Sequence, residues 1–158
     1  FTCTMIQEIN AMCSVINGGS YYQPHLVTEI RDSNGSTVKK IDPILMKQTV
    51  SSEISADIRS YMEASVQEGT SRTSKVEGYS SGGKTGTAEN SHGRDHGLFV
   101  ACGPVDNPEL VVVCIVEQGG FGSTAAGPIV YKAFEEFFQE RGYMPRPKPE
   151  SEPAQVQQ

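Results

Sequence analysis

The residues best suited to chemistry lie in one short segment, SGGKTGTAE at positions 81–89. Two patterns overlap there. Residues 78–85 fit the phosphate-binding loop of nucleotide-binding proteins, which has four residues between its first glycine and Gly-Lys-Thr. From Lys84 onward the same residues read Lys-Thr-Gly-Thr, the third signature of serine acyl-transfer enzymes that react with penicillin. The elements that flank the segment must decide between the two chemistries.

A phosphate-binding loop needs a buried strand before it and a helix that begins at the Lys-Thr pair, because helical N–H groups bind the phosphates. Residues 71–77, SRTSKVE, contain too few apolar side chains for a central parallel strand. Gly86 and Gly93 follow the pair, and a glycine costs a helix about 1 kcal/mol relative to alanine. The apolar run 110–116, with a glutamate after it, resembles a Walker-B strand and leaves nucleotide binding open as an alternative.

A strand at residues 84–87 explains the side chains of this segment better than a phosphate-binding loop does. With a period of two residues, Lys84 and Gly86 share one face, and Thr85 and Thr87 share the other. Glycine within a strand permits another group to approach the backbone closely. An edge strand with unpaired N–H and C=O groups can bind an extended peptide by strand addition. For these four residues alone, an ordinary glycine-rich edge strand with a solvated lysine is the simpler interpretation.

The surrounding segments favour the second chemistry. The chain resembles the C-terminal part of the transpeptidase domain of class B penicillin-binding proteins, and in particular the elongation-type, rod-shape enzymes. The resemblance extends from Phe1 to about Tyr143. Five segments carry it in the family's order: NGGSYYQPHLV (17–27), SGGKTGTAE (81–89), DHGLFV (95–100), DNPEL continuing to EQGG (106–120) and AAGPI (125–129).

The resemblance implies a role for each residue of the Lys-Thr-Gly-Thr strand. Lys84 maintains the electrostatics of the active site and faces the hydroxyl of the family's second motif. Thr85, Gly86 and Thr87 bind the substrate, with both threonines hydrogen-bonded to the carboxylate of substrate or penicillin. The backbone N–H of Thr87 forms half of the oxyanion hole. Loss of one such donor typically lowers the rate about 100- to 1,000-fold.

The resemblance also implies a reaction and its ligands. Such enzymes cross-link peptidoglycan by transferring an acyl group from a D-Ala-D-Ala stem peptide through a serine acyl-enzyme. The expected ligands are therefore the stem peptide and β-lactam antibiotics, without a cofactor or a metal ion. The expected location is the extracytoplasmic face of the bacterial cell membrane, reached through an N-terminal anchor outside this chain.

Two motifs that this chemistry needs do not appear in the family's form. These motifs are Ser-x-x-Lys, which supplies the nucleophile and its base, and Ser-x-Asn. No asparagine in the chain has a serine two positions before it. We therefore expect residues 1–143 to be the C-terminal portion of a transpeptidase domain that needs the remainder of the domain as its partner. The sequence is also compatible with a serine β-lactamase relative or a non-catalytic relative.

A Ser-x-x-Lys match at Ser36 to Lys39 follows the dipeptide Asn34-Gly35, which is a strong hairpin signal. In the family the motif opens a helix, where residues i and i+3 share a face. On a strand, Ser36 and Lys39 point to opposite faces, so Ser36 is not expected to be a nucleophile. The predicted hairpin register pairs Ser33 with Ser36, Arg31 with Val38, and Glu29 with Lys40.

Composition sets further bounds. A net charge of −6 and a charged fraction of 20% give no electrostatic case for nucleic-acid binding. His92, Asp95 and His96 have a spacing that could suit a metal, but Gly93 disfavours a helix there, so a solvated loop is the better interpretation. All four cysteines are predicted to be small core residues: Cys3, Cys13, Cys102 and Cys114.

The patterns predict an α+β fold. Three strands at 82–89, 96–103 and 109–117 should form an antiparallel sheet, preceded by an extended segment and a hairpin that ends near residue 41. Residues 144–158 are rich in proline and polar residues and are predicted to be a disordered tail. Three helices should pack on the sheet: one capped by Thr2 or Thr4 and ending at Gly18, one capped by Ser51 or Ser52 and stopping near Gly69, and one starting at Ser123 or Thr124 with Pro128 in its first turn.

Each helix is predicted to turn one apolar face inward. The inward residues are Met5, Ile9, Met12, Cys13 and Ile16 in the first helix; Ile54, Ile58, Tyr61, Met62 and Val66 in the second; and Ile129, Val130, Ala133, Phe134, Phe137 and Phe138 in the third.

Overall fold

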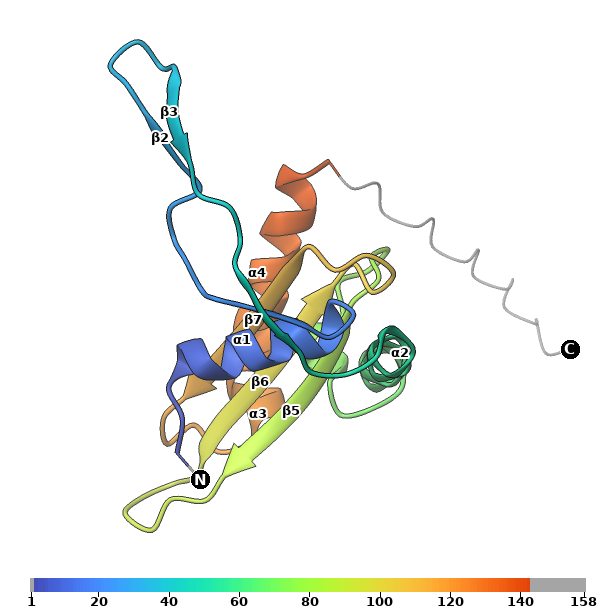
Figure 1. Cartoon of the computed structure of the whole chain (residues 1–158). Helices are drawn as coiled ribbons and strands as arrows, with labels where there is room; N and C mark the ends of the chain where they lie inside the picture. The colour runs from blue at the N-terminus through green and yellow to red at the C-terminus, as the bar shows by residue number, and fades with distance from the viewer. Residues whose placement is uncertain (1, 143–158) are drawn as a thin grey trace, which may run out of the picture.

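A three-stranded antiparallel sheet forms the centre of the molecule (Figure 1). The computed structural model describes residues 2–142. Strands β5 (Gly82–Ala88), β6 (His96–Gly103) and β7 (Leu110–Val116) lie in the order β5-β6-β7, each antiparallel to its neighbour. Their bounds agree with the predicted strands to within one residue. The α+β fold is confirmed, whereas the predicted tail at 144–158 lies outside the described residues.

Helices cover both faces of this sheet. Helix α1 (Met5–Ile16) crosses one face, and α2 (Ser52–Gln67) packs beside β5. The short helix α3 (Gly122–Ala125) and helix α4 (Gly127–Glu140) lie on the other face. A 3-10 helix, η1 (Arg72–Ser74), connects α2 to the strand β5.

The central strand β6 contributes alternate side chains to two apolar clusters, because successive side chains of a strand point to opposite faces. Phe99 and Ala101 join the cluster that contains Phe134 and Phe138 of α4. Cys102 belongs to the other cluster, beneath α1 and α2. The sheet is therefore buried on both faces along β6, with β5 paired to it from Gly82 to Ala88.

Helix ends follow local chemistry closely. Thr4 caps α1 in a complete capping box with Gln7, and Ser51 caps α2 by accepting from the Ile54 N–H. The predicted serine or threonine cap of the last helix is wrong. Phe121 occupies the N-cap position of α3 without a side-chain hydrogen bond, and a separate helix, α4, begins at Gly127 with proline in its first turn.

The predicted inward faces of the helices are too wide. Ile54, Tyr61 and Ile129 are exposed, although the apolar pattern predicts that each faces inward. Each stands one position before a buried residue, which are Ser55, Met62 and Val130 respectively. One residue advances about 100° around a helix, so these three side chains leave the narrow buried stripe. Met5 in the first turn of α1 is exposed as well.

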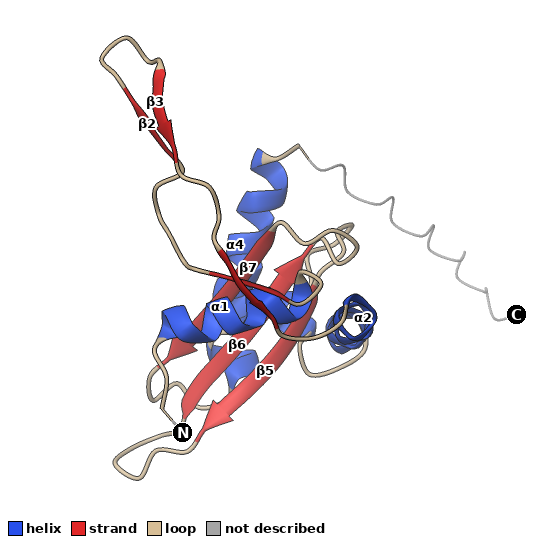
Figure 2. Ribbon diagram, viewed as in Figure 1, coloured by secondary structure: helices blue, strands red, loops and turns tan. Residues whose placement is uncertain are grey.

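A hairpin of β2 (Glu29–Arg31) and β3 (Thr37–Lys40) extends away from the sheet (Figure 2). The hairpin is confirmed, and Glu29 lies opposite Lys40 as predicted. The prediction of a tight turn at Asn34-Gly35 is wrong, because Arg31 lies opposite Thr37 rather than Val38. The Asp32 carboxylate accepts the N–H groups of residues 34 and 36, which widens the loop and introduces a bulge.

Two further strands flank the hairpin, and one of them, β4 (Leu45–Gln48), has no counterpart in the sequence prediction. Strand β1 (Ser20–Tyr22) pairs with β4 at the base of the hairpin. The predicted extended segment 21–27 is a strand only at its start. Every residue of β4 is exposed, so its side chains carry no alternation of buried and exposed positions. Without that alternation, the sequence has no strand signal there.

The four cysteines occupy different environments. Cys102 is fully buried, and burial raises the pKa of its thiol from 9.0 to about 11. Cys13 and Cys114 are half-buried, and all four thiols are free. Cys102 lies opposite Val111, so the strands hold it out of register with Cys114 as predicted. The expectation of a core position is wrong for Cys3, which precedes α1 and is exposed.

Thiol reactivity is expected to follow these environments. At about pH 8, a thiol-disulfide reagent should label Cys3 first, whereas Cys102 should react only after unfolding. A pKa raised from 9.0 to about 11 lowers the thiolate fraction about 100-fold, and burial also blocks access. Peptide mass spectrometry of a labelling time course measures the order. Equal labelling rates for the two thiols in the folded protein would contradict it.

Candidate functional site

The Lys-Thr-Gly-Thr residues lie in the second half of β5, at the edge of the described sheet. Lys84 and Gly86 lie opposite Val100 and Leu98 of β6. Thr85 and Thr87 lie opposite Phe99 and Gly97, and Phe99 belongs to the α4 cluster. The predicted division into two faces is therefore confirmed, with Lys84 on the side of α1 and α2.

Lys84 is exposed, and its Nζ donates to the backbone carbonyl of Thr85 at 2.5 Å. It lines a shallow cavity of about 220 Å³ whose other walls come from α1 and α2. Those walls are mostly apolar: Met12, Ile58, Tyr61 and Met62. Lys84 therefore brings a positive charge beside an apolar hollow, where an anion that lost part of its hydration would interact more strongly with the charge.

The hydroxyl of Thr85 contacts the hydroxyl of a residue outside the sheet. Its Oγ1 lies 3.2 Å from Oγ1 of Thr70, which follows α2. The sequence analysis did not identify Thr70, because the two residues are 15 positions apart and no local pattern connects them. Thr87 is exposed beyond this contact, near the end of the strand.

Two loops are joined at the Thr87 end of the sheet. The His96 Nδ1 accepts the backbone N–H of Gln118 at 2.9 Å, and the Gly120 N–H donates to the carbonyl of Asp95 at 2.8 Å. A hollow of about 280 Å³ lies beside this contact, lined in part by Arg94 and the exposed Phe121. Residues 2–142 contain no group of side chains that could hold a metal ion.

The phosphate-loop interpretation is wrong. Residues 82–88 form a strand, so the chain does not enter a helix at Lys84 and Thr85. The binding of phosphate by such a loop depends on that helix N-terminus. The apolar run 110–116 is β7, an antiparallel strand at the edge of the described sheet rather than a central parallel one.

Neither Ser-x-x-Lys match can pair a nucleophile with a base. Ser36 and Lys39 lie in the exposed hairpin, at the loop and in β3, as predicted. The same spacing also occurs at Ser81 and Lys84. Ser81 is 1% exposed, and on extended backbone residues three apart point to opposite faces. Neither serine can be activated by the lysine of its own match.

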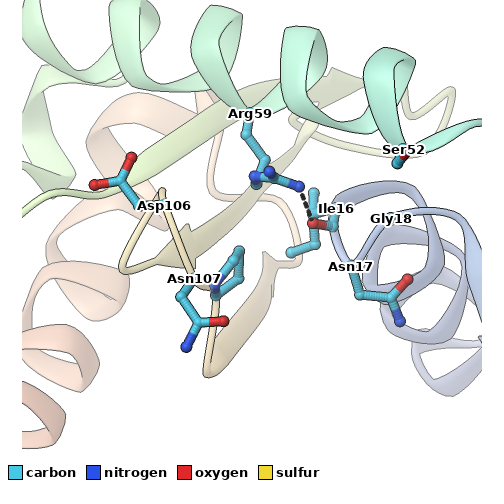
Figure 3. A pocket seen from close by; sticks show the side chains of 8 residues that line it. Ile16, Asn17, Gly18, Ser52, Arg59, Asp106 and Asn107 are labelled. Carbon is cyan, nitrogen blue, oxygen red and sulfur yellow. Dashed lines mark hydrogen bonds between the residues drawn. The ribbon is translucent and has the colours of Figure 1, made fainter.

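Another pocket lies at the Gly82 end of the sheet, between α1, α2 and the β6–β7 turn (Figure 3). Its centre is Arg59, whose Nη1 donates to the Ile16 carbonyl at 2.7 Å and to Ser55 Oγ at 3.0 Å. The Ile16 carbonyl is at the end of α1, so Arg59 satisfies a backbone group that the helix leaves unpaired. Arg59 therefore joins α1 to α2, and its pocket lies at the opposite end of β5 from Thr87.

None of the helices within residues 2–142 combines the length and the apolar character that crossing a membrane requires.

Comparisons with known proteins agree on one family. The sequence model of the penicillin binding protein transpeptidase domain matches residues 1–135. Stage V sporulation protein D of Bacillus subtilis is 40% identical over 157 residues, which is 90% of this chain and 24% of that protein. Peptidoglycan D,D-transpeptidase MrdA of Acinetobacter baumannii is 30% identical over 141 residues, or 80% of this chain and 21% of that protein.

Solved structures show the same fold. The D,D-transpeptidase domain of a peptidoglycan glycosyltransferase from Eggerthella lenta superimposes with a TM-score of 0.80 at 26% identity, covering 90% of this chain and 33% of that one. Penicillin-binding protein A from M. tuberculosis, solved as an imipenem acyl-enzyme complex, gives a TM-score of 0.75 at 23% identity over 87% of this chain and 31% of that one.

The chain spans about a quarter of the length of the curated relatives it matches. The match covers the sheet, both of its helical faces and the Lys-Thr-Gly-Thr strand. This chain therefore belongs to the penicillin-binding protein transpeptidase domain family.

Proposed function

We propose that this chain forms the substrate-binding portion of a peptidoglycan D,D-transpeptidase. The observation that carries the proposal is Lys-Thr-Gly-Thr in the edge strand β5, within a chain whose residues 1–135 match the family. The relatives named peptidoglycan D,D-transpeptidases support the reaction. The ligands are then a D-Ala-D-Ala stem peptide and, in its place, a β-lactam.

Each site residue has one task in this proposal. Lys84 supplies positive charge at the cavity beside α2, and Thr85 and Thr87 donate to the ligand carboxylate. Gly86 lets the ligand approach the backbone of β5, and the Thr87 N–H donates to the oxyanion that forms when the serine attacks. An extended stem peptide would then lie along the unpaired edge of β5.

The serine nucleophile and its lysine base lie outside these 158 residues in the proposed enzyme. Residues 1–143 form the C-terminal portion of the transpeptidase domain, and the remainder of the domain completes the site. Catalysis takes place on the extracytoplasmic face of the bacterial cell membrane, where peptidoglycan is cross-linked. Neither Ser36 nor Ser81 has a lysine base from its own match, and this supports an external nucleophile.

Labelling with a fluorescent penicillin tests the proposal. Residues 1–158 alone should remain unlabelled on a denaturing gel, whereas a protein extended through the upstream coding region should carry a covalent label. The label should persist, because a transpeptidase acyl-enzyme is hydrolysed slowly by comparison with that of a β-lactamase. Rapid loss of the label would favour a β-lactamase.

Two further outcomes would contradict the proposal in different ways. A label on residues 1–158 alone would identify a serine of this chain as the nucleophile. An extended, folded protein that never reacts would favour a non-catalytic relative.

A further inference from the structure

The loop that carries Thr70 is held firmly against the end of α2. The Ser71 N–H donates to the Ser65 carbonyl at 3.1 Å, and the two serine hydroxyls lie 2.9 Å apart. Ser71 is fully buried. Arg72 Nε donates to the carbonyl of Gly69 at 3.1 Å on the other side. Thr70 therefore stands between two anchored neighbours, and its backbone has little freedom.

From this position Thr70 reaches across to β5. Its Oγ1 lies 3.2 Å from the Oγ1 of Thr85. The neighbouring ammonium of Lys84 donates to the backbone carbonyl of Thr85, whereas the Thr85 hydroxyl pairs with Thr70. Either hydroxyl could donate in the free protein, and a ligand decides which one does.

A carboxylate is an acceptor only, so Thr85 can bind it only by donating its single hydroxyl proton. The lone pairs of Thr85 Oγ1 are then free to accept, and Thr70 is placed to donate to them. A hydroxyl that accepts one hydrogen bond also becomes a better donor, because hydrogen bonds in a chain polarise one another. The Thr70 contact thus holds Thr85 in one orientation and directs its proton away from the α2 loop.

We propose that Thr70 is a positioning residue, which orients the Thr85 hydroxyl toward the carboxylate of a bound stem peptide or β-lactam. This inference rests on the proposed function of β5. Thr70 itself touches no ligand, and its effect passes through Thr85. The relay is Thr70 donating to Thr85, and Thr85 donating to the carboxylate.

The test uses a protein extended through the upstream coding region and measures the second-order rate of acylation by penicillin G. Thr70→Val keeps the shape of the side chain and removes the hydroxyl. It should lower the rate roughly 3- to 10-fold, the effect of one hydrogen bond. Thr70→Ser should restore it. In a Thr85→Val background, Thr70→Val should have no further effect, because the relay is already broken.

A second measurement compares the acid with an uncharged ligand. A purely structural role of Thr70 would affect the acylation rates with the two ligands equally. With the uncharged methyl ester of penicillin G, Thr70→Val should alter the rate less than about 2-fold, roughly the smallest effect of a hydrogen bond. Thr49→Val is the control, since it also breaks a hydroxyl pair, with Ser14 at 3.3 Å, together with a hydrogen bond to the Gly19 carbonyl at 3.0 Å, away from β5. Its acylation rate should equal that of the unmodified protein.

Three results would overturn the inference: an unchanged rate in Thr70→Val, no recovery in Thr70→Ser, or an equal loss with the acid and its ester. Failure of the proposed function is distinguishable from these, because the unmodified extended protein would then not react with penicillin at all.

Discussion

Replacing Lys84 with methionine is expected to lower the rate of penicillin acylation about 100- to 1,000-fold in a protein extended through the upstream coding region. The substitution removes the positive charge at the cavity beside α2 and keeps an unbranched apolar side chain along its walls. Because Lys84 is exposed, its replacement should leave the fold intact. Stopped-flow acylation kinetics with a chromogenic cephalosporin measure the rate.

Lys47→Met provides the matched control for this prediction. Lys47 is also an exposed strand lysine, in β4, and it lies over the ring of Tyr21, away from β5. The control should react at the rate of the unmodified protein. If Lys84→Met reacted as fast as the control while circular dichroism showed both to be folded, Lys84 would have no part in the chemistry.

Phe134→Ala is expected to reduce the free energy of unfolding by about 3 to 5 kcal/mol, the usual result of removing a buried phenylalanine. Phe134 is fully buried in the cluster beneath α4, with its ring centroid 5.6 Å from that of Phe138. A methyl group added at Gly103 would lie 2.9 Å from the Phe134 ring, so β6 packs directly on it. Urea denaturation of the extended protein, followed by circular dichroism, measures the change.

The same helix supplies the control for this loss of stability. Ile129 is 53% exposed on α4, and Ile129→Ala should change the free energy of unfolding by no more than about 0.5 kcal/mol. A small effect at Phe134, or equal effects at the two positions, would show that α4 does not pack on the sheet as described.

Much of the fold could be predicted from local patterns. Strands β5, β6 and β7 agree with the sequence prediction because turn residues bound each of them and β6 and β7 are rich in apolar side chains. Thr4 and Ser51, each one of two cap candidates in the sequence prediction, cap α1 and α2, since a cap depends only on residues within one turn.

Local patterns failed where a neighbour distant in the sequence decides the outcome. Apolar spacing alone could not separate Ile54, Tyr61 and Ile129 from the buried residues next to them, because the width of a helix's buried stripe depends on what packs against it. The pairing of β1 with β4 left no alternation to detect, since β4 is exposed along its length.

The candidate site divides in the same way. The residue types and the two-residue strand period of Lys84 to Thr87 predict which face of β5 carries the charge and the glycine and which carries the two hydroxyls. The surroundings of these residues could not be predicted, namely the apolar walls at Lys84 and the Thr70 hydroxyl at Thr85. Adjacent residues set the geometry of a strand, whereas these contacts join residues that are distant in the sequence and form only once α2 has packed beside the sheet.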